Sequence, residues 1–146
     1  MTRDVAATRQ EVWDVMADGW TYSQWVVGNS RMRAVDRRWP EPGTEVRHSI
    51  GVWPAVINDG TVAEECVPLE ELVLLARMGP FGAARVTMRL SDLPDGCRVE
   101  MDEVIVHGPL SVVPAPLQLL YMWPRNRECL WRLGALAERL EPKDLS

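Results

Sequence analysis

Residues 114–140, with the sequence PAPLQLLYMWPRNRECLWRLGALAERL, form the only stretch of this chain long and regular enough to be a helix that covers a sheet. Apolar residues recur at helical spacing in its second half, at Leu130, Leu133, Ala137 and Leu140, with Cys129 and Leu136 widening the stripe. Charged residues fall on the opposite side, at Arg125, Glu128, Arg132 and Arg139. The stretch therefore predicts one long C-terminal helix with a single buried face.

Two residues weaken this helix. Pro124 removes a backbone hydrogen bond, so residues 116–123 are either a kinked first section or a separate turn. Gly134 costs about 1 kcal/mol relative to alanine inside a helix. These breakers are either tolerated imperfections, which we favour, or the signs of a movable lid over a cavity.

The N-terminal part predicts one short strand and two short helices. Residues 5–7 can form only a short strand, and Thr8 with Glu11 makes a capping box that starts a helix near Arg9. Gly19 is expected to end this helix in a left-handed conformation. Thr21-Tyr22-Ser23-Gln24 repeats the capping pattern and predicts a second helix through about residue 26, closed by Gly28.

The middle of the chain alternates apolar and polar residues with a period of two, in short runs separated by Pro, Gly, Asn and Asp. This pattern is typical of antiparallel strands joined by hairpins. We expect six strands, at residues 31–37, 44–51, 55–66 (bent at 58–60), 70–77, 83–91 and 97–106. The fold class is then α+β, with about seven strands in the order β-α-α-β6-α and the curved sheet gripping the last helix.

Composition limits the kinds of partner. The 146 residues carry a net charge of −5 and no long basic run, so we expect a single domain spanning 1–146 that does not bind nucleic acid. The sequence shows no signal peptide and no membrane-spanning run, so a cytoplasmic protein without stable membrane insertion is expected, as a monomer or homodimer. Its three cysteines, Cys66, Cys97 and Cys129, lack metal-ligand spacing and are expected to be reduced. No cofactor is expected, because phosphate-loop and nucleophile-elbow motifs are also lacking.

Several short motifs carry a resemblance to a known family. They are Val5-Ala6-Ala7-Thr8 before Val12-Trp13-Asp14-Val15, then Trp25-Val26-Val27-Gly28, Trp39-Pro40, Pro42-Gly43-Thr44, and Glu103 before Gly108-Pro109. Together with the order of elements, they resemble the SRPBCC superfamily of START-like helix-grip proteins, which includes polyketide cyclase/dehydrase-type and birch-pollen-allergen-like proteins. The resemblance covers nearly the whole chain, although the first strand is shorter than the family pattern. It implies a deep hydrophobic cavity between the sheet and the last helix, but no single reaction.

Strand alternation predicts which polar side chains face this cavity. His48 shares a side with Val46 and Ile50, and Glu103 shares a side with Met101 and Ile105. His107 continues the inward set if its strand does not bulge. A carboxylate among apolar neighbours must be neutral, paired or hydrogen-bonded, so Glu103 is either an acid/base group or the partner of an arginine such as Arg125. His48 is either a satisfied core residue or a proton carrier.

Aromatic residues are the other candidates for the cavity. The chain has seven Trp but only two Tyr and one Phe, and Trp joins a large apolar body to one polar group. We expect the cavity mouth to be lined by Trp25, Trp53, Tyr121 and Trp123, with Asn126 available for a ligand carbonyl. Trp13 and Trp39 are assigned to the core or the sheet edge.

Three functions follow from the sequence. The first is binding of a small hydrophobic molecule such as a polyketide, lipid or aromatic metabolite, with Met101, His107 and the aromatic residues as the ligand-binding set. The second is a cofactor-free polyketide cyclase or dehydratase with Glu103 and His48 as the catalytic acid and base. The third is a structural or interaction module whose cavity is filled by its own side chains. The sequence leaves open whether the protein is an enzyme.

Overall fold

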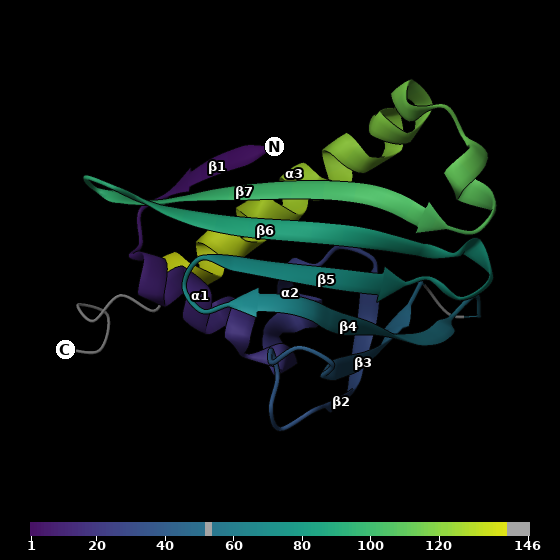
Figure 1. Ribbon diagram of the computed structural model, residues 1–146, viewed down its shortest axis with the longest axis horizontal. Helices are drawn as coiled ribbons and strands as arrows, with labels where there is room; N and C mark the ends of the chain where they lie inside the picture. Colours follow the sequence, from purple (N-terminus) through teal and green to yellow (C-terminus); the bar gives the residue numbers. More distant parts are fainter. Residues whose placement is uncertain (52–53, 140–146) are drawn as a thin grey trace.

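Seven antiparallel strands form one curved sheet that wraps a long C-terminal helix in the computed structural model, which describes residues 1–51 and 54–139 (Figure 1). The strands are β1 (Thr2–Val5), β2 (Asn29–Val35), β3 (Glu45–Ile50), β4 (Ile57–Val67), β5 (Glu71–Arg77), β6 (Ala83–Leu93) and β7 (Gly96–His107). The helices are α1 (Arg9–Ala17), α2 (Tyr22–Trp25) and α3 (Ala115–Arg139), with three short 3₁₀ turns, η1 (Gly19–Thr21), η2 (Gly79–Phe81) and η3 (Pro109–Val112). This is the helix-grip arrangement that the sequence predicted.

The strands lie in the order β1-β7-β6-β5-β4-β3-β2, so only β1 is separated in sequence from its neighbour in the sheet. The N-terminal strand occupies residues 2–5 rather than 5–7, and it pairs with residues 97–100 of β7. The prediction was wrong because Ala6 and Ala7 have already left the sheet on the way to Thr8, the cap of α1, and the backbone N–H of Ala6 donates to the Glu138 carboxylate on α3 instead of to a strand. The strand β4 pairs regularly with β3 through residues 58–60, and its irregularity lies between Ala63 and Glu65.

The helix α1 begins as its sequence predicts, because the Thr8 side chain accepts from the backbone N–H of Glu11. The prediction for Gly19 was wrong, since this residue is not left-handed but is buried against β2 and β3. A Cβ atom at Gly19 would lie 2.5 Å from Val35 Cγ1. The expected side-chain cap at Thr21 is also missing, because its hydroxyl donates to the backbone oxygens of Val15 and Asp18 instead.

The helix α3 runs without a break through Pro124, so residues 116–123 belong to it and do not form a separate turn. Pro124 is exposed and so is Leu120, whose carbonyl lacks a helical donor and can therefore bind water. The buried face continues the predicted stripe upstream, through Cys129 and Asn126 to Met122. Gly134 lies on this buried face against Val5, so its missing side chain lets α3 approach β1 closely.

One hydrophobic core joins the inner face of the sheet to all three helices. Trp13 and Trp39 are buried in it as expected, and the indole N–H of Trp39 donates to the backbone oxygen of Met16. Cys97 and Cys129 are buried free thiols, and Cys66 is half-buried and also free. Leu140 and the remaining C-terminal residues lie outside the described part of the chain.

Candidate ligand cavity

A cavity of about 120 Å³ lies between the inner face of the sheet, α2 and the first half of α3. Its walls are mostly apolar, with a few polar groups at defined positions. The strands contribute Asn29, His48, Ile50, Ala76, Arg77, Glu103 and Ile105, and the helices and loops contribute Tyr22, Val26, Val27, Gly28, Met78, Leu110, Tyr121, Met122 and Arg125. Mostly apolar walls with few polar groups are typical of small-molecule sites.

Three buried polar side chains form a chain of hydrogen bonds at this cavity. The Thr61 hydroxyl lies 2.9 Å from the Tyr22 hydroxyl and 2.9 Å from His48 Nε2. The rings of Tyr22 and His48 stack with their centres 5.3 Å apart. Because Thr61 is fully buried and contacts both side chains, it holds the phenol and the imidazole in fixed orientations.

Burial sets the charge of both rings. Removal from water lowers the pKa of His48 to about 4, so its imidazole is neutral at pH 7. Burial likewise raises the pKa of Tyr22 to about 12, so its phenol is neutral as well. The Nδ1 atom of His48 is buried and has no hydrogen-bond partner among the described residues. The part of the wall formed by Tyr22 and His48 is therefore polar but uncharged at pH 7.

The second polar group is an ion pair between sheet and helix. Arg125 Nη1 donates to the Glu103 carboxylate at 3.1 Å and to Asn126 Oδ1 at 3.1 Å, and its Nε donates to the backbone oxygen of Val27. Burial is the largest single effect and would lower the pKa of Arg125, but the negative charge of Glu103, together with the smaller effects of Cys129, Tyr22 and Tyr121, raises it. The pair is the one that the sequence offered as an alternative to a free acid/base group, and this prediction is confirmed. The helical pattern put Arg125 on the solvated side, and that prediction was wrong because the long side chain turns inward to reach Glu103.

Three of the residues that we predicted for the site line the cavity: His48, Glu103 and Tyr121. Trp25, Met101 and Asn126 are buried beside it but are not part of its wall. Trp25 packs edge-on against Tyr22, and Asn126 accepts from Arg125, so each supports a residue of the wall. Their assignment to ligand binding stays a prediction.

Two predicted residues lie elsewhere, and a third is not described. His107 is exposed and does not line the cavity, because a register irregularity pairs Ala83 with His107 but Ala84 with Ile105, which displaces the inward set by one residue. Trp123 is exposed on the outer side of α3, where the Arg127 guanidinium lies 5.4 Å from its ring centre. Trp53 lies outside the described residues.

Sequence reasoning missed Tyr22, Thr61 and Arg77. Tyr22 was treated as part of a cap, and Thr61 followed a predicted bend, although Thr61 shares the inward side of β4 with Ala63, a signal that could have found it. Arg77 bonds to the Glu45 carboxylate and lies 3.4 Å from the Asp59 carboxylate, next to the cavity. The described residues contain no cluster of three or more metal-ligating side chains.

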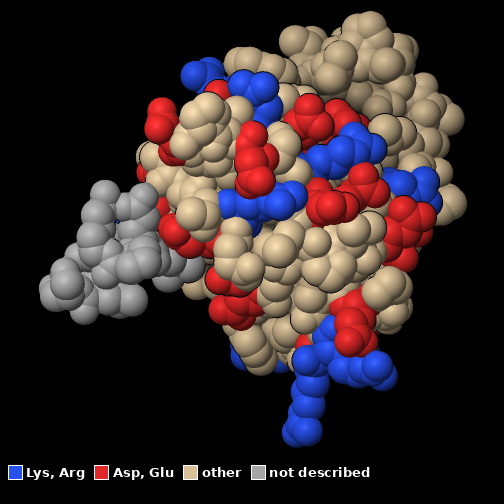
Figure 2. Space-filling model, turned by 60° about the vertical axis from the view of Figure 1, so that its left-hand side comes forward, with Lys and Arg blue, Asp and Glu red and all other residues tan. Residues whose placement is uncertain are grey.

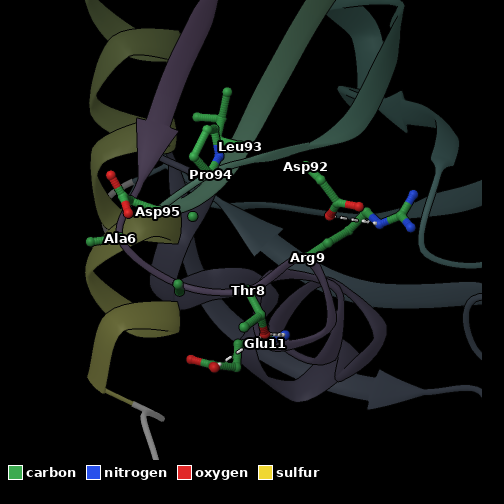
Figure 3. Close-up of a pocket in the computed structure, with 10 residues that line it drawn as sticks. Ala6, Thr8, Arg9, Glu11, Asp92, Leu93, Pro94 and Asp95 are labelled. Atoms are coloured by element: carbon green, nitrogen blue, oxygen red, sulfur yellow. Dashed lines mark hydrogen bonds and ion pairs between the residues drawn. The ribbon is translucent and has the colours of Figure 1, made fainter.

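A larger hollow of about 320 Å³ lies on the surface beside the start of α1 (Figure 3). Several of its polar side chains have partners: Thr8 and Glu11 contact each other in the helix cap, and Arg9 lies 3.3 Å from Asp92. The smaller interior cavity differs from this hollow in its mostly apolar walls. Among the helices that the structure describes, none has the length and apolar character needed to span a membrane.

Comparison with known proteins adds support for the fold. Neither a protein-family model nor a curated protein matches the sequence. Protein NE0264 from Nitrosomonas europaea has a similar structure, with a TM-score of 0.73 and 16% identity over 97% of this chain and 94% of that one. The structures of other proteins are similar as well, among them two described as aromatase/cyclases.

The first is the di-domain aromatase/cyclase StfQ from the steffimycin biosynthetic pathway, with a TM-score of 0.72 and 12% identity. The match covers 95% of this chain and 49% of StfQ. The second is the ZhuI aromatase/cyclase from Streptomyces sp. R1128, with a TM-score of 0.67 and 17% identity over 95% of this chain and 92% of that one. At these identities the comparisons establish a shared helix-grip fold.

Proposed function

We propose that this protein is a member of the SRPBCC superfamily that binds a small, largely apolar molecule in the cavity between the sheet and α3. The observation that carries the proposal is an interior space of about 120 Å³ with apolar walls and polar groups at defined positions. Interior side chains normally pack without such gaps. The unfilled volume supports ligand binding over the third alternative, a module whose cavity its own side chains fill.

The volume limits the size of the ligand. A cavity of about 150 Å³ holds one benzene molecule, so this cavity suits one six-membered ring or a short acyl chain. Neutral Tyr22 and His48 favour a ligand that carries an uncharged hydrogen-bonding group, such as a carbonyl or hydroxyl. A larger ligand such as a polycyclic polyketide would need α3 to move away from the sheet.

The state of Glu103 supports binding over catalysis. Its carboxylate is paired with Arg125, so it is not a free acid or base. Cofactor-free cyclisation or dehydration with His48 and Glu103 is the second candidate, and the observation that favours it is the neutral imidazole on the cavity wall. The shared fold of the aromatase/cyclases StfQ and ZhuI adds to this alternative.

Binding can be tested with a pair of neighbouring substitutions on β7. Ile105→Trp fills the cavity, whereas Val104→Trp puts the same side chain on the opposite, solvent side of the strand. Phenol, cyclohexanone and hexanol serve as probes in ligand-observed NMR, together with mass spectrometry of any small molecule that copurifies with the protein. We expect wild type and Val104→Trp to bind at least one probe and Ile105→Trp to lose it.

Two results would contradict the binding proposal. One is that wild type binds no probe and copurifies with no small molecule. The other is that Ile105→Trp, shown to be folded by circular dichroism, binds as well as Val104→Trp. The catalytic alternative requires conversion of a poly-β-ketone probe by wild type, detected by mass spectrometry and lost in His48→Gln.

A further inference from the structure

The first half of α3 and the turn before it form an uncharged and exposed part of the molecule. Residues 108–124 contain no Asp, Glu, Lys or Arg. They form η3 and the first turns of α3, which rise clear of the strands beside the end of β7 (Figure 1). In Figure 2 this end of the molecule is the tan projection at the upper right.

Large apolar side chains cover this region, and each exposes more than half of its surface. Leu120 is 74% exposed and Tyr121 is 73% exposed. The set on or beside the outer side of α3, which we call the apolar outer face, consists of Leu117, Leu120, Tyr121, Trp123 and Trp131. Val112 in η3 and Leu119, at a helical position on the side of Asn126, are exposed as well. Contiguous apolar patches of this size on soluble proteins mark interaction sites.

The spacing along α3 turns much of this face into a helical stripe. Leu117, Leu120, Pro124 and Trp131 follow one another at intervals of three, four and seven residues, so they share one side of the helix. The buried stripe of Met122, Asn126, Cys129 and Leu133 lies on the opposite side. The inner stripe packs against the core of this chain. The outer stripe is a second apolar surface of the same helix, and none of the described residues packs against it.

Area and charge favour a second copy of this chain as that partner. The five large side chains of the apolar outer face, at about 100 Å² each, give roughly 500 Å² per copy and so roughly 1,000 Å² for a symmetric pair, the least that a specific interface buries. The chain carries a net charge of −5, which opposes contact with anionic surfaces such as nucleic acid or acidic lipid. Because residues 108–124 carry no charge, two acidic copies can meet through this segment without bringing like charges into contact.

We propose that the protein forms a twofold homodimer in which the outer faces of two α3 helices pack against each other, antiparallel and crossing near Pro124. The same surface then serves both copies, as in the isologous interfaces of most dimers. Arg127 and Glu128 flank the stripe and form a polar rim. Tyr121 belongs to both the face and the cavity wall, but Leu117, Leu120 and Trp131 do not line the cavity, so substitutions at these residues test the dimer separately from ligand binding.

Sedimentation equilibrium over a concentration series tests the dimer, with Leu120→Glu and Leu117→Glu as disrupting variants and Val104→Glu as the control. Val104 is also an exposed apolar residue, but it lies on the solvent side of β7. We expect wild type and Val104→Glu to reach twice the chain mass of 16.5 kDa. Each α3 variant should weaken the dimer more than about tenfold, as central contacts do.

The outcomes separate the proposal from its alternatives. All substituted side chains are exposed, so circular dichroism should show folded variants and confirm that a lost dimer is not a lost fold. A wild type that stays monomeric throughout the series, or a dimer that survives both α3 substitutions, would overturn the proposal. Flotation with phosphatidylcholine vesicles is the further test: vesicle binding by monomeric wild type, lost in Leu120→Glu, would assign the face to lipid instead.

Discussion

Arg125 on α3 and Glu103 on β7 form an ion pair, with Nη1 of the arginine 3.1 Å from Oε2 of the glutamate. The Glu103 side chain is 7% exposed and that of Arg125 is 24% exposed. Arg125 also donates to the backbone of Val27 after α2, so one guanidinium connects the helix, the sheet and the loop at the cavity. A buried charge with such partners becomes costly when one partner is removed.

Glu103→Gln should therefore lower the free energy of unfolding by about 2 kcal/mol, because the positive charge of Arg125 loses its counter-charge. Chemical denaturation at pH 7 measures the change. Glu100→Gln on the solvent side of the same strand is the control and should change the free energy by less than about 0.5 kcal/mol. Equal effects of the two substitutions would show that the ion pair does not connect helix to sheet.

Thr61→Val should destabilise the protein by about 1 to 3 kcal/mol, because it leaves the buried Tyr22 hydroxyl and His48 Nε2 without their shared partner. The substitution keeps the shape of the side chain, so the loss reports hydrogen bonding rather than packing. Thr87→Val, on the solvent side of β6, provides the matched control. If thermal unfolding gave the same change for both variants, the Tyr22–Thr61–His48 chain would not contribute to stability.

Stability should fall as the pH is lowered from about 6.5 to 4, because His48 binds a proton in the unfolded chain before it does so in the folded protein. The contribution of His48 to stability is fully present at pH values above the pKa of the unfolded chain. As the pH falls from there to the pKa of the folded protein, a contribution of roughly 3 kcal/mol is lost. Urea denaturation of wild type and His48→Gln across the interval measures it. The slope due to the histidine should vanish in His48→Gln and persist in His107→Gln, which changes the only other histidine; an unchanged slope in His48→Gln would contradict the prediction.

Gly19→Ala should destabilise the protein by about 1 to 3 kcal/mol, because the new Cβ would lie 2.5 Å from Val35 Cγ1 and 2.8 Å from Val46 Cγ1 in a packed core. Gly134→Ala is the comparison, since its nearest neighbours, in Arg3 and Val5, are 3.3 Å away. Alanine also favours the helix at that position by up to about 1 kcal/mol. The midpoint temperature of thermal unfolding should be much lower for Gly19→Ala than for Gly134→Ala. The reverse order would show that the residues around Gly19 move apart at little cost.

Local patterns in the sequence determined the order of elements and much of the inner wall. Strand alternation turned His48 and Glu103 inward, and the Thr8 and Glu11 capping pair started α1 at the expected residue. These features were predictable because they depend on residues next to each other in the chain, where the periods of strand and helix decide the side that each residue faces.

Tertiary structure decided the features that depend on a distant partner. The sequence offered the pairing of Glu103 with Arg125 as one of two alternatives, and the structure decided for it because the long arginine side chain reaches the carboxylate out of water. His107 turned outward because the end of β7 lost its regular register with β6. Gly19 became a packing residue instead of a helix terminator because β2 and β3 approach it closely. The exposure of the outer face of α3 was likewise decided by the tertiary structure, because helical periodicity identifies a stripe but does not say whether another surface covers it.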